Sequence, residues 1–473
     1  MRSDLWSKLV ARCNNDWLWN LTEQSRLILD RTTESSQDLQ ESTKAKLQEI
    51  SFVGKQSSNN KLNIVIVELD PIDFLSAFLA ALIKGTNIFL CDPGWQQQEW
   101  QQVLNLVQPD FVFARRQTKD LLLNIKATAT NKNALQPNLD RASLIMIPTG
   151  GSSGKIKFAM HSWSTLSASV MGFKSYFGCQ KINSFCTLPL YHVSGLMQFM
   201  RSFITEGNLI IGSYKAIANK PIEFQTRDYF ISLVPTQLQL SIDAVPDKLK
   251  EFKTILLGGA SISRSLLNEA RKHNLPLAPT YGMTETASGV VTLKPKDFLA
   301  GNNSNGRVLS HATVIIESQN SPGLINIKCA SLCLGYYPKV FDNSSIFVTD
   351  DLGYFDPKGF LYIFGRNSQK IITGGENVFP AEVEAAILET KLVKDVCVIG
   401  ISNRKWGQIV TAVYVPLPVK QDLDLIKNKI KLQLAKYKQP KKWIEVNKLP
   451  RNNRGKINYQ KVKEIALQLT INN

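Results

Sequence analysis

Residues 147–158 read Ile-Pro-Thr-Gly-Gly-Ser-Ser-Gly-Lys-Ile-Lys-Phe and directly follow an apolar, strand-like run. Glycine lets a backbone approach a ligand closely and present its N–H groups, while hydroxyl and ammonium groups add donors for anionic oxygen. The stretch therefore predicts a loop that holds a polyphosphate, and a flexible surface turn is the alternative that it leaves open on its own. The residues expected to bind the phosphates are Thr149, Gly150, Gly151, Ser152, Ser153, Gly154, Lys155 and Lys157.

The glycine spacing excludes a P-loop NTPase. That motif has four residues between its glycines and a Ser or Thr after its lysine. Here Gly150 and Gly154 are one residue too close, and Ile156 follows the lysine. The order Thr-Gly-Gly-Ser-Ser-Gly-Lys-x-Lys instead resembles the phosphate loop of the adenylate-forming superfamily, which contains acyl-CoA synthetases, luciferases and the adenylation domains of peptide synthetases. The superfamily usually reads T-S-G-T-T-G-x-P-K-G, from which Gly150, Ile156 and Phe158 depart.

Strand-like runs alternate with helix-like runs in two parts of the chain. The first part has strands expected at 62–69, 87–90 and 111–114 and helices at 72–84 and 95–107. The second has strands at 229–234 and 254–257 and helices at 236–244 and before His273. Such alternation predicts parallel strands joined by crossover helices, so we expect an α/β fold.

The C-terminal part of the sequence differs from the rest. From about Asp350 it becomes rich in turns and glycine, and beyond residue 370 it changes to a short α+β pattern with many lysines. The length of 473 residues exceeds that of a typical single domain. We therefore expect a large N-terminal domain at 1–366, with parallel-rich sheets and crossover helices, and a small mobile α+β domain at 367–473.

The composition indicates a globular, cytosolic protein. The apolar fraction is 44%, and the longest apolar stretch, 74–83, is far shorter than the ~20 residues that a membrane span needs. Residues 1–20 mix charged side chains with tryptophans and lack the continuous apolar core of an export signal. Seven scattered cysteines and four histidines predict buried free thiols, with neither a disulfide framework nor a zinc site.

The net charge of +17 suits a nucleic-acid-binding protein and equally an enzyme whose substrates are the anions ATP and coenzyme A. The charge is densest in the last 50 residues, which predicts a basic face there. We expect no nucleic-acid partner, because ordered Gly, Thr and Glu motifs have no purpose in binding one.

A second motif lies at residues 280–288, Thr-Tyr-Gly-Met-Thr-Glu-Thr-Ala-Ser, after an apolar segment where a parallel strand is expected to end. Ligands of open α/β sheets sit at such ends, and a carboxylate among hydroxyls suits Mg²⁺ on substrate phosphates. A capped helix start with Glu285 in its first turn is the alternative. The stretch resembles the superfamily's Y-G-x-T-E motif. The resemblance implies that Thr284 contacts the acyl carboxylate or the α-phosphate, Glu285 binds Mg²⁺, and Tyr281 stacks on adenine. The other residues expected at the nucleotide here are Gly258, Gly259, Ala260 and Gly282.

A third motif begins with residues 348–353, Val-Thr-Asp-Asp-Leu-Gly, and continues with Phe-Gly-Arg at 364–366. A buried carboxylate can accept both hydroxyls of a ribose, and an arginine can add a charged donor. A tight turn and a surface cation are the plain alternative. The order resembles the superfamily's T-G-D-L-G motif, which implies a ribose contact for Asp351, with Asp350 in place of the usual glycine, and a second contact for Arg366.

A fourth motif lies at residues 449–457, Leu-Pro-Arg-Asn-Asn-Arg-Gly-Lys-Ile. A lysine on a glycine-containing loop of a mobile domain can stabilise charge that develops on an α-phosphate, whereas a basic tail is the default reading of such a charge run. The stretch resembles the superfamily's catalytic-lysine loop, which implies that role for Lys456. The resemblance also implies that the C-terminal domain rotates about a hinge just after Arg366, at Ser368.

The acid substrate is indicated by residues 188–196, Leu-Pro-Leu-Tyr-His-Val-Ser-Gly-Leu, which resemble a P-L-F-H-x-S-G-L segment of ortho-succinylbenzoate CoA ligases. A dicarboxylate needs one carboxylate to react and the other to be neutralised, and Arg201 is the cation expected to neutralise it. His192 and Ser194 are expected at the acid as well, although His192 can equally be a gate or a packed ring.

Coenzyme A is the expected thiol. Gly374, Gly375 and Glu376, together with residues 406–408, resemble segments that line the CoA tunnel of the ligases. The basic C-terminal face would attract the phosphates of CoA. The lysines considered for this contact are Lys436, Lys438 and Lys441.

The four motifs span Thr149 to Lys456 in the superfamily's order. Membership implies that a carboxylate attacks ATP to give an acyl-adenylate and pyrophosphate, and that a thiol then displaces AMP. The hypothesis is therefore an AMP-forming carboxylate–CoA ligase that acts on ortho-succinylbenzoate in menaquinone or phylloquinone biosynthesis. The alternatives are another aryl- or fatty-acyl-CoA ligase, a stand-alone adenylation protein that loads a carrier, and a nucleic-acid-binding protein. A homo-oligomer is compatible with the sequence.

Overall fold

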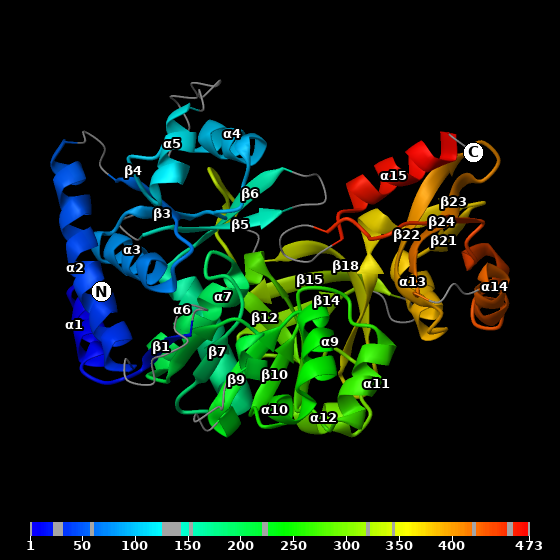
Figure 1. The fold of residues 1–473 in the computed structure, drawn as a ribbon, viewed down its shortest axis with the longest axis horizontal. Coiled ribbons are helices and arrows are strands. Elements are labelled where there is room, and N and C mark those ends of the chain that lie inside the picture. Colours follow the sequence, from blue (N-terminus) through cyan, green and yellow to red (C-terminus); the bar gives the residue numbers. More distant parts are fainter. Residues whose placement is uncertain are drawn as a thin grey trace.

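The computed structural model describes residues 2–21, 32–56, 61–124, 143–150, 155–219, 226–317, 322–342, 346–418, 422–451 and 457–471. Figure 1 shows an elongated molecule with α1 (Arg2–Cys13) and α2 (Thr32–Gln56) at one end and the C-terminal elements, in orange and red, at the other. Within the described ranges the strands form four sheets.

The seven-stranded sheet, in the order β17-β16-β6-β5-β3-β2-β4, carries the strand that leads into the glycine-rich stretch. Its strands are β2 (Asn63–Val67), β3 (Asn87–Leu90), β4 (Phe111–Ala114), β5 (Ile145–Gly150), β6 (Ile156–His161), β16 (Gly335–Tyr336) and β17 (Lys339–Val340). β4, β2, β3 and β5 are parallel, and β6 is antiparallel to both β5 and β16. The helices are α3 (Pro71–Lys84), α4 (Gln97–Leu106) and α5 (Arg116–Asn124), which confirms the expected alternation.

The eight-stranded sheet has the order β1-β8-β7-β9-β10-β11-β12-β13. Its strands are β1 (Leu18–Leu21), β7 (Asn183–Cys186), β8 (Leu209–Gly212), β9 (Tyr229–Leu233), β10 (Thr254–Leu257), β11 (Leu277–Met283), β12 (Ser288–Thr292) and β13 (Arg307–Val308). The first six in this order are parallel and the last two antiparallel. Its helices are α6 (Trp163–Phe177), α7 (Val193–Thr205), α8 (Ala216–Asn219), α9 (Pro235–Ala244), α10 (Pro246–Lys250), α11 (Arg264–Lys272) and α12 (Pro295–Leu299).

These two sheets and their helices form layers. One face of β2 and β3 packs with α3, α6, α7 and the inner face of β7 and β8 in a common core. The opposite face of β2 and β3 packs on α4, and the opposite face of β7 and β8 belongs to the core under α9 and α11. Strands buried on both faces explain why the sequence shows continuous apolar runs here rather than alternation. Helix α3 is closed at both ends, by the Asp70 side chain at its start and by Gly85 in a left-handed conformation at its end.

The four-stranded sheet is antiparallel and follows the order β14-β15-β18-β19. Its strands are β14 (Ala312–Ile316), β15 (Gly323–Cys329), β18 (Phe347–Phe355) and β19 (Leu361–Arg366). The expectation of turns from about Asp350 is wrong for this segment, because Asp350 and Asp351 lie inside β18. Both edges of β18 pair with neighbouring strands, and that long-range pairing overrides the local turn preference of Asp and Gly.

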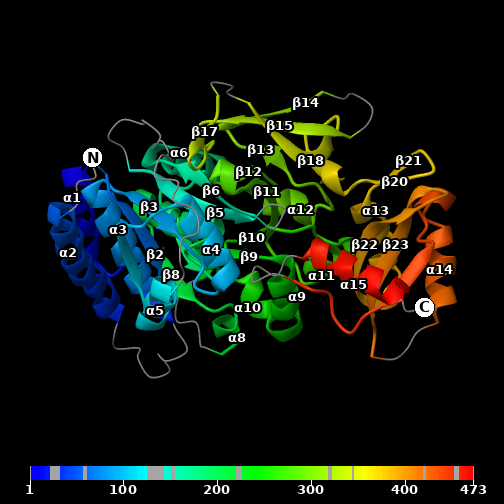
Figure 2. The same cartoon turned by 90° about the horizontal axis from the view of Figure 1, so that it is seen from above.

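The C-terminal sheet contains β20 (Ile371–Thr373), β21 (Glu376–Val378), β22 (Val393–Asn403), β23 (Gly407–Pro416) and β24 (Lys442–Glu445). Its helices are α13 (Pro380–Glu389), α14 (Leu423–Lys431) and α15 (Tyr459–Ile471). They form two cores with this sheet, with α13 and α14 in one and α15 in the other. A short 3₁₀ turn, Asn367–Gln369, connects β19 to β20, and Figure 2 shows the C-terminal elements together at one end. The division into domains at 366/367 and its mobility stay predictions.

Of the helices that the structure describes, none combines the length and hydropathy that crossing a bilayer requires. All seven cysteines are free thiols, and six of them are buried, as expected.

Candidate active site

The Thr-Tyr-Gly-Met-Thr-Glu motif lies at the end of β11 and in a 3₁₀ turn, Thr284–Thr286, that leads into β12. The strand was expected to end before the motif, but it continues to Met283 because residues 280–283 pair with β12. Gly282 sits at an irregularity of this pairing. A Cβ atom there would lie 2.0 Å from the Ser288 carbonyl oxygen, so only glycine fits. The alternative of an α-helix start capped by a threonine is wrong, because residues 284–286 form a single 3₁₀ turn and Met283 stands at its cap position.

The Glu285 carboxylate is buried, with 7% of the residue exposed. Its Oε1 accepts a hydrogen bond from the Tyr336 hydroxyl at 2.7 Å, and Oε2 has no hydrogen-bond partner within the described ranges. The ammonium group of Lys157 lies over the Tyr336 ring, 5.1 Å from its centre. A single carboxylate with one open oxygen fits Mg²⁺, which takes one or two protein carboxylates and fills its other positions with water and phosphate oxygens.

The backbone of this turn is bonded to other segments at each carbonyl from Thr284 to Ala287. The Thr284 oxygen accepts from His161 Nε2 at 2.7 Å, and the Glu285 oxygen accepts from the Cys333 amide at 2.7 Å. The next two carbonyls accept from the hydroxyls of Ser331 and Ser169, at 2.8 and 2.7 Å. Burial lowers the pKa of His161 to about 4, so the ring is neutral and donates from Nε2. The turn is therefore held from outside in one conformation.

Asp351 and Arg366, which were expected at the ribose, come together with Tyr281, which was expected at the adenine. The Tyr281 hydroxyl donates to Asp351 Oδ2 at 2.9 Å, and Arg366 Nε lies 3.4 Å from Asp351 Oδ1. Burial and the adjacent Asp351 charge raise the pKa of the Tyr281 hydroxyl. The Tyr281 ring belongs to a buried core, and stacking on adenine stays a prediction. Asp350 points elsewhere: it accepts hydrogen bonds from the backbone N–H of Ser368, at 3.0 Å, and from its hydroxyl.

The end of β5 and the Gly258–Ala260 segment flank the same motif. Thr149 and Gly150 end β5, with Lys157 opposite Thr149 on β6. Gly258 directly follows β10 and lies against Thr280. A Cβ atom on Gly258 would lie 2.5 Å from the Thr280 hydroxyl oxygen. Gly259 has a left-handed backbone, and Ala260 is exposed. Lys155 is exposed at the start of β6. The other predicted residues, Gly151, Ser152, Ser153, Gly154 and Lys456, lie outside the described residues.

Arg201 lies in α7 and is 5% exposed. Its guanidinium covers the Phe173 ring, 4.1 Å from the ring centre, and Nη2 donates to the Ser288 hydroxyl at 3.2 Å. Its Nε has no partner, and no carboxylate of the part of the chain that the structure describes forms an ion pair with it. Burial lowers the pKa of Arg201 to about 10. Arg201 is thus a buried cation beside the segment that carries Glu285.

His192 and Ser194 lie at the start of the same helix. His192 precedes the first turn of α7, is buried, and packs its ring edge-on against Tyr191 at 4.6 Å. Ser194 is half-buried, and its carbonyl accepts a hydrogen bond from Gln198. His311, which is partly buried, packs against Gly172, and desolvation together with the Arg201 charge lowers its pKa to about 4.

Gly374 and Gly375 form the turn between β20 and β21, and both have left-handed backbones. A Cβ atom on Gly374 would lie 2.8 Å from the Trp406 ring, and its N–H donates to the Trp406 carbonyl at 2.9 Å. The ammonium group of Lys441 lies over this exposed ring, with Nζ 3.3 Å from the ring centre. Lys438 instead pairs with Glu382 at 2.6 Å.

Two side chains at the site, His161 and Tyr336, were not predicted from the sequence. Each contacts the 284–285 turn from a distant segment. The only local signal was a histidine at the end of an otherwise apolar strand, Phe158–His161. Tyr336 gave no signal, because it stands beside a second tyrosine in an ordinary Gly-Tyr-Tyr-Pro run.

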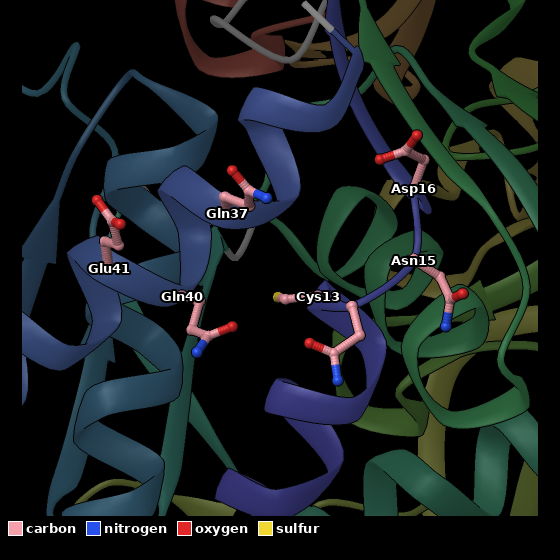
Figure 3. A pocket seen from close by; sticks show the side chains of 7 residues that line it. Cys13, Asn15, Asp16, Gln37, Gln40 and Glu41 are labelled. Carbon is pink, nitrogen blue, oxygen red and sulfur yellow. The ribbon is translucent and has the colours of Figure 1, made fainter.

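A polar cavity of about 570 Å³ lies away from these motifs, near the N-terminus. Figure 3 shows lining side chains on and between α1 and α2, with Cys13, Asn15, Asp16, Gln37, Gln40 and Glu41 labelled. Asn14 lines the cavity as well. None of the predicted site residues lines it.

Comparison with known proteins places the motifs in a family context. Residues 60–337 match the AMP-binding enzyme family, and residues 382–456 match the AMP-binding enzyme C-terminal domain. The 2-succinylbenzoate–CoA ligase of Listeria monocytogenes is 35% identical over 340 residues, covering 69% of this chain and 71% of that protein. The ligase of the same name from Staphylococcus epidermidis is 33% identical over 347 residues, covering 71% and 72%. The o-succinylbenzoate CoA synthetase of Bacillus subtilis, solved with the acyl-adenylate OSB-AMP, shares the fold, with a TM-score of 0.80, 24% identity and coverage of 96% and 97%.

Proposed function

The chain belongs to the AMP-binding enzyme family, and from this premise we propose that it is an ATP-dependent, AMP-forming carboxylate–CoA ligase. The acid that we infer is ortho-succinylbenzoate, and the product is ortho-succinylbenzoyl-CoA, an intermediate of menaquinone or phylloquinone biosynthesis. Curated relatives that are 35% and 33% identical carry the name 2-succinylbenzoate–CoA ligase, which supports this substrate.

The observation that carries the choice of acid is the buried guanidinium of Arg201. A buried charge without a carboxylate partner destabilises a fold by several kcal/mol, so it is retained where something else neutralises it. Arg201 has one hydrogen bond, to Ser288, and no ion-pair partner within the described ranges. Ortho-succinylbenzoate has two carboxylates, so one can react with ATP while the other pairs with Arg201. A monocarboxylic acid would leave the guanidinium unpaired.

The adenylation step needs the nucleotide and the reacting carboxylate to be held close together. Asp351, which has Arg366 beside it, would bind the ribose, and Lys155 and Lys157 would bind the phosphates. Thr284 would contact the reacting carboxylate or the α-phosphate. Mg²⁺ held by Glu285 would neutralise phosphate charge.

Lys456 would stabilise the charge that develops on the α-phosphate as the carboxylate attacks. The residues on either side of its loop pair with each other, since Arg451 and Ile457 form a β-bridge and the Asn458 amide donates to the Pro450 carbonyl at 2.8 Å. Arg451 also pairs with Asp395 at 2.6 Å. The base of this loop is therefore fixed to the C-terminal sheet, which supports delivery of Lys456 by movement of that domain about Ser368.

Thioester formation requires a site for coenzyme A. The Trp406 ring is exposed, with Gly374 beside it and the Lys441 ammonium group over it. It offers apolar ring surface next to a cation. Such a surface suits the adenine and phosphates of CoA. Free thiols and the use of ATP and CoA are compatible with a cytosolic location.

The experiment is mass spectrometry of the products formed by the purified protein with ATP, Mg²⁺ and a set of acids. The set contains ortho-succinylbenzoate, benzoate and a fatty acid, each with CoA or with a carrier protein as acceptor. We expect AMP, pyrophosphate and ortho-succinylbenzoyl-CoA from the first acid and little product from the others. Preference for benzoate or the fatty acid would refute the substrate, and acylation of the carrier alone would refute the acceptor.

A further inference from the structure

The turn that carries Thr284 and Glu285 is joined to the strand that follows the glycine-rich stretch. Strand β6 follows that stretch, and its last residue, His161, donates to the Thr284 carbonyl. Strand β16 lies beside β6, with Tyr336 opposite Ala159, and the Tyr336 hydroxyl donates to Glu285. The turn belongs to the eight-stranded sheet and both donors to the seven-stranded sheet. These two bonds therefore fix the positions of the two sheets' functional segments relative to each other.

Tyr336 makes one contact through its hydroxyl and another through its ring. Its hydroxyl holds one oxygen of Glu285 at 2.7 Å, and its ring lies under the ammonium group of Lys157 at 5.1 Å. The segment is fixed on β6 by the amides of Leu334 and Tyr337, which donate to the Met160 and Phe158 carbonyls. A hydrogen bond to one carboxylate oxygen sets the direction of the other, because the two oxygens share one plane. Tyr336 thus sets where Oε2 of Glu285 points.

His161 acts on the backbone of the same turn. Its ring is fully buried, and Nδ1 lies 3.0 Å from the Thr165 hydroxyl while Nε2 donates to the Thr284 carbonyl at 2.7 Å. A ring held at both nitrogens cannot rotate, so the Thr284 carbonyl is fixed as well. The position of the Thr284 side chain follows from that of its backbone.

We propose that Tyr336 and His161 are positioning residues of the adenylation reaction: Tyr336 orients the Glu285 carboxylate for the metal–nucleotide complex, and His161 orients Thr284. The proposal rests on the proposed use of ATP but not on which acid is the substrate. Neither residue touches the reacting atoms. Both act through a residue that does.

The first test measures the binding of ATP to the full-length protein by calorimetry, once with Mg²⁺ and once with EDTA. Tyr336→Phe keeps the ring and removes the hydroxyl, so we expect the gain in affinity that Mg²⁺ confers to fall by about tenfold, with binding in EDTA unchanged. Tyr337→Phe is the matched control, since Tyr337 is the next residue and packs its ring on Phe89. An unchanged gain in Tyr336→Phe, or an equal loss in Tyr337→Phe, overturns the role of Tyr336.

The second test asks whether Tyr336 acts through Glu285. Tyr336→Phe is introduced into the wild-type protein and into Glu285→Gln, and ATP–pyrophosphate exchange is measured in all four proteins. We expect about a tenfold loss in the wild-type background and less than about a twofold loss in the Glu285→Gln background. Equal losses in both backgrounds would show that Tyr336 acts independently of Glu285 and would contradict the proposal.

The third test separates positioning by His161 from simple packing. His161→Leu fills the space without a donor, and His161→Gln keeps an N–H group of similar reach. We expect kcat of the exchange reaction to fall about tenfold in the Leu variant, with KM for ATP within about twofold, and to recover to within about threefold in the Gln variant. Equal kcat values in the two variants overturn the role of His161. If the wild-type protein does not bind ATP, the proposed function is overturned as well. If the wild-type protein binds ATP but the variants do not show the expected losses, only the roles of Tyr336 and His161 are overturned.

Discussion

The turn at 284–287 and the guanidinium of Arg201 both contact the segment around Ser288. The protein itself supplies hydrogen-bond partners for the whole turn but few for the guanidinium. Each carbonyl of the turn is bonded to a group from another segment. Arg201 is equally buried, but it has one hydrogen bond and no ion pair within the described ranges. The difference suggests that the chain itself completes the part of the site that every acid uses. The part that selects the acid is left for the substrate to complete.

Loss of the Glu285 charge, in the fully bonded turn at 284–287, should lower the activity most. Glu285→Gln keeps an acceptor for the Tyr336 hydroxyl but removes the charge that faces Mg²⁺, so we expect ATP–pyrophosphate exchange to fall by about 10²–10³-fold, or roughly 3–4 kcal/mol. Exchange rates under saturating ATP measure this loss. A loss below about tenfold would show that Glu285 is not the metal ligand.

The second prediction concerns the pH dependence of the free energy of unfolding, through His161, which bonds to the turn at 284–287. Burial lowers the pKa of His161 to about 4, below the ordinary value of 6.5, so unfolding takes up a proton between these pH values. His161 therefore contributes stability that is fully present above pH 6.5 and lost as the pH falls towards 4, by about 3 kcal/mol. Urea unfolding of wild type and His161→Gln across this range measures the difference. Parallel stability–pH curves for the two proteins would contradict the neutral, buried ring.

The third prediction concerns Arg201, which has no ion pair within the described ranges. Its replacement should stabilise the fold while it lowers the activity. Arg201→Met removes a buried cation without an ion pair while keeping its length, so we expect the free energy of unfolding to rise by about 1 kcal/mol. Activity with ortho-succinylbenzoate should fall at the same time by about 2 kcal/mol, or about 30-fold. Thermal unfolding and steady-state kinetics test both. A destabilised variant would mean that Arg201 already has a partner in the folded protein.

The smallest effect concerns the ribose contact. Tyr281→Phe removes the hydroxyl that donates to Asp351, which we expect to weaken nucleotide binding by about 1 kcal/mol and raise KM for ATP about fivefold. Tyr414→Phe is a matched control, because the Tyr414 hydroxyl also donates to a carboxylate, Glu445, in the C-terminal sheet. A similar change in KM for ATP in both variants would remove the ribose assignment.

The sequence predicted those parts of the fold in which local pattern and tertiary environment agree. The strands at 87–90, 111–114 and 254–257 have the predicted bounds because each is a short apolar run in a parallel part of its sheet. The extension of β11 and the strand character of residues 350–353 were missed. Both depend on pairing with strands that are distant along the chain, which local preferences do not report.

The same distinction applies to the site. The motif residues Asp351, Arg366 and Tyr281 were predicted and come together. His161 and Tyr336 were missed because each acts across a sequence separation of 123 and 51 residues, respectively. Arg201 was predicted as a cation, but its burial could not be predicted, since an arginine near the end of an amphipathic helix is ordinarily exposed.

Selection by Arg201 of an acid with a second carboxylate is tested by comparing kcat/KM for ortho-succinylbenzoate with kcat/KM for an analogue that lacks the carboxylate that does not react. We expect wild type to prefer the dicarboxylate by about 30-fold or more and Arg201→Met to lose that preference. Equal use of the two acids by wild type, or an unchanged preference in Arg201→Met, would show that Arg201 does not select the acid.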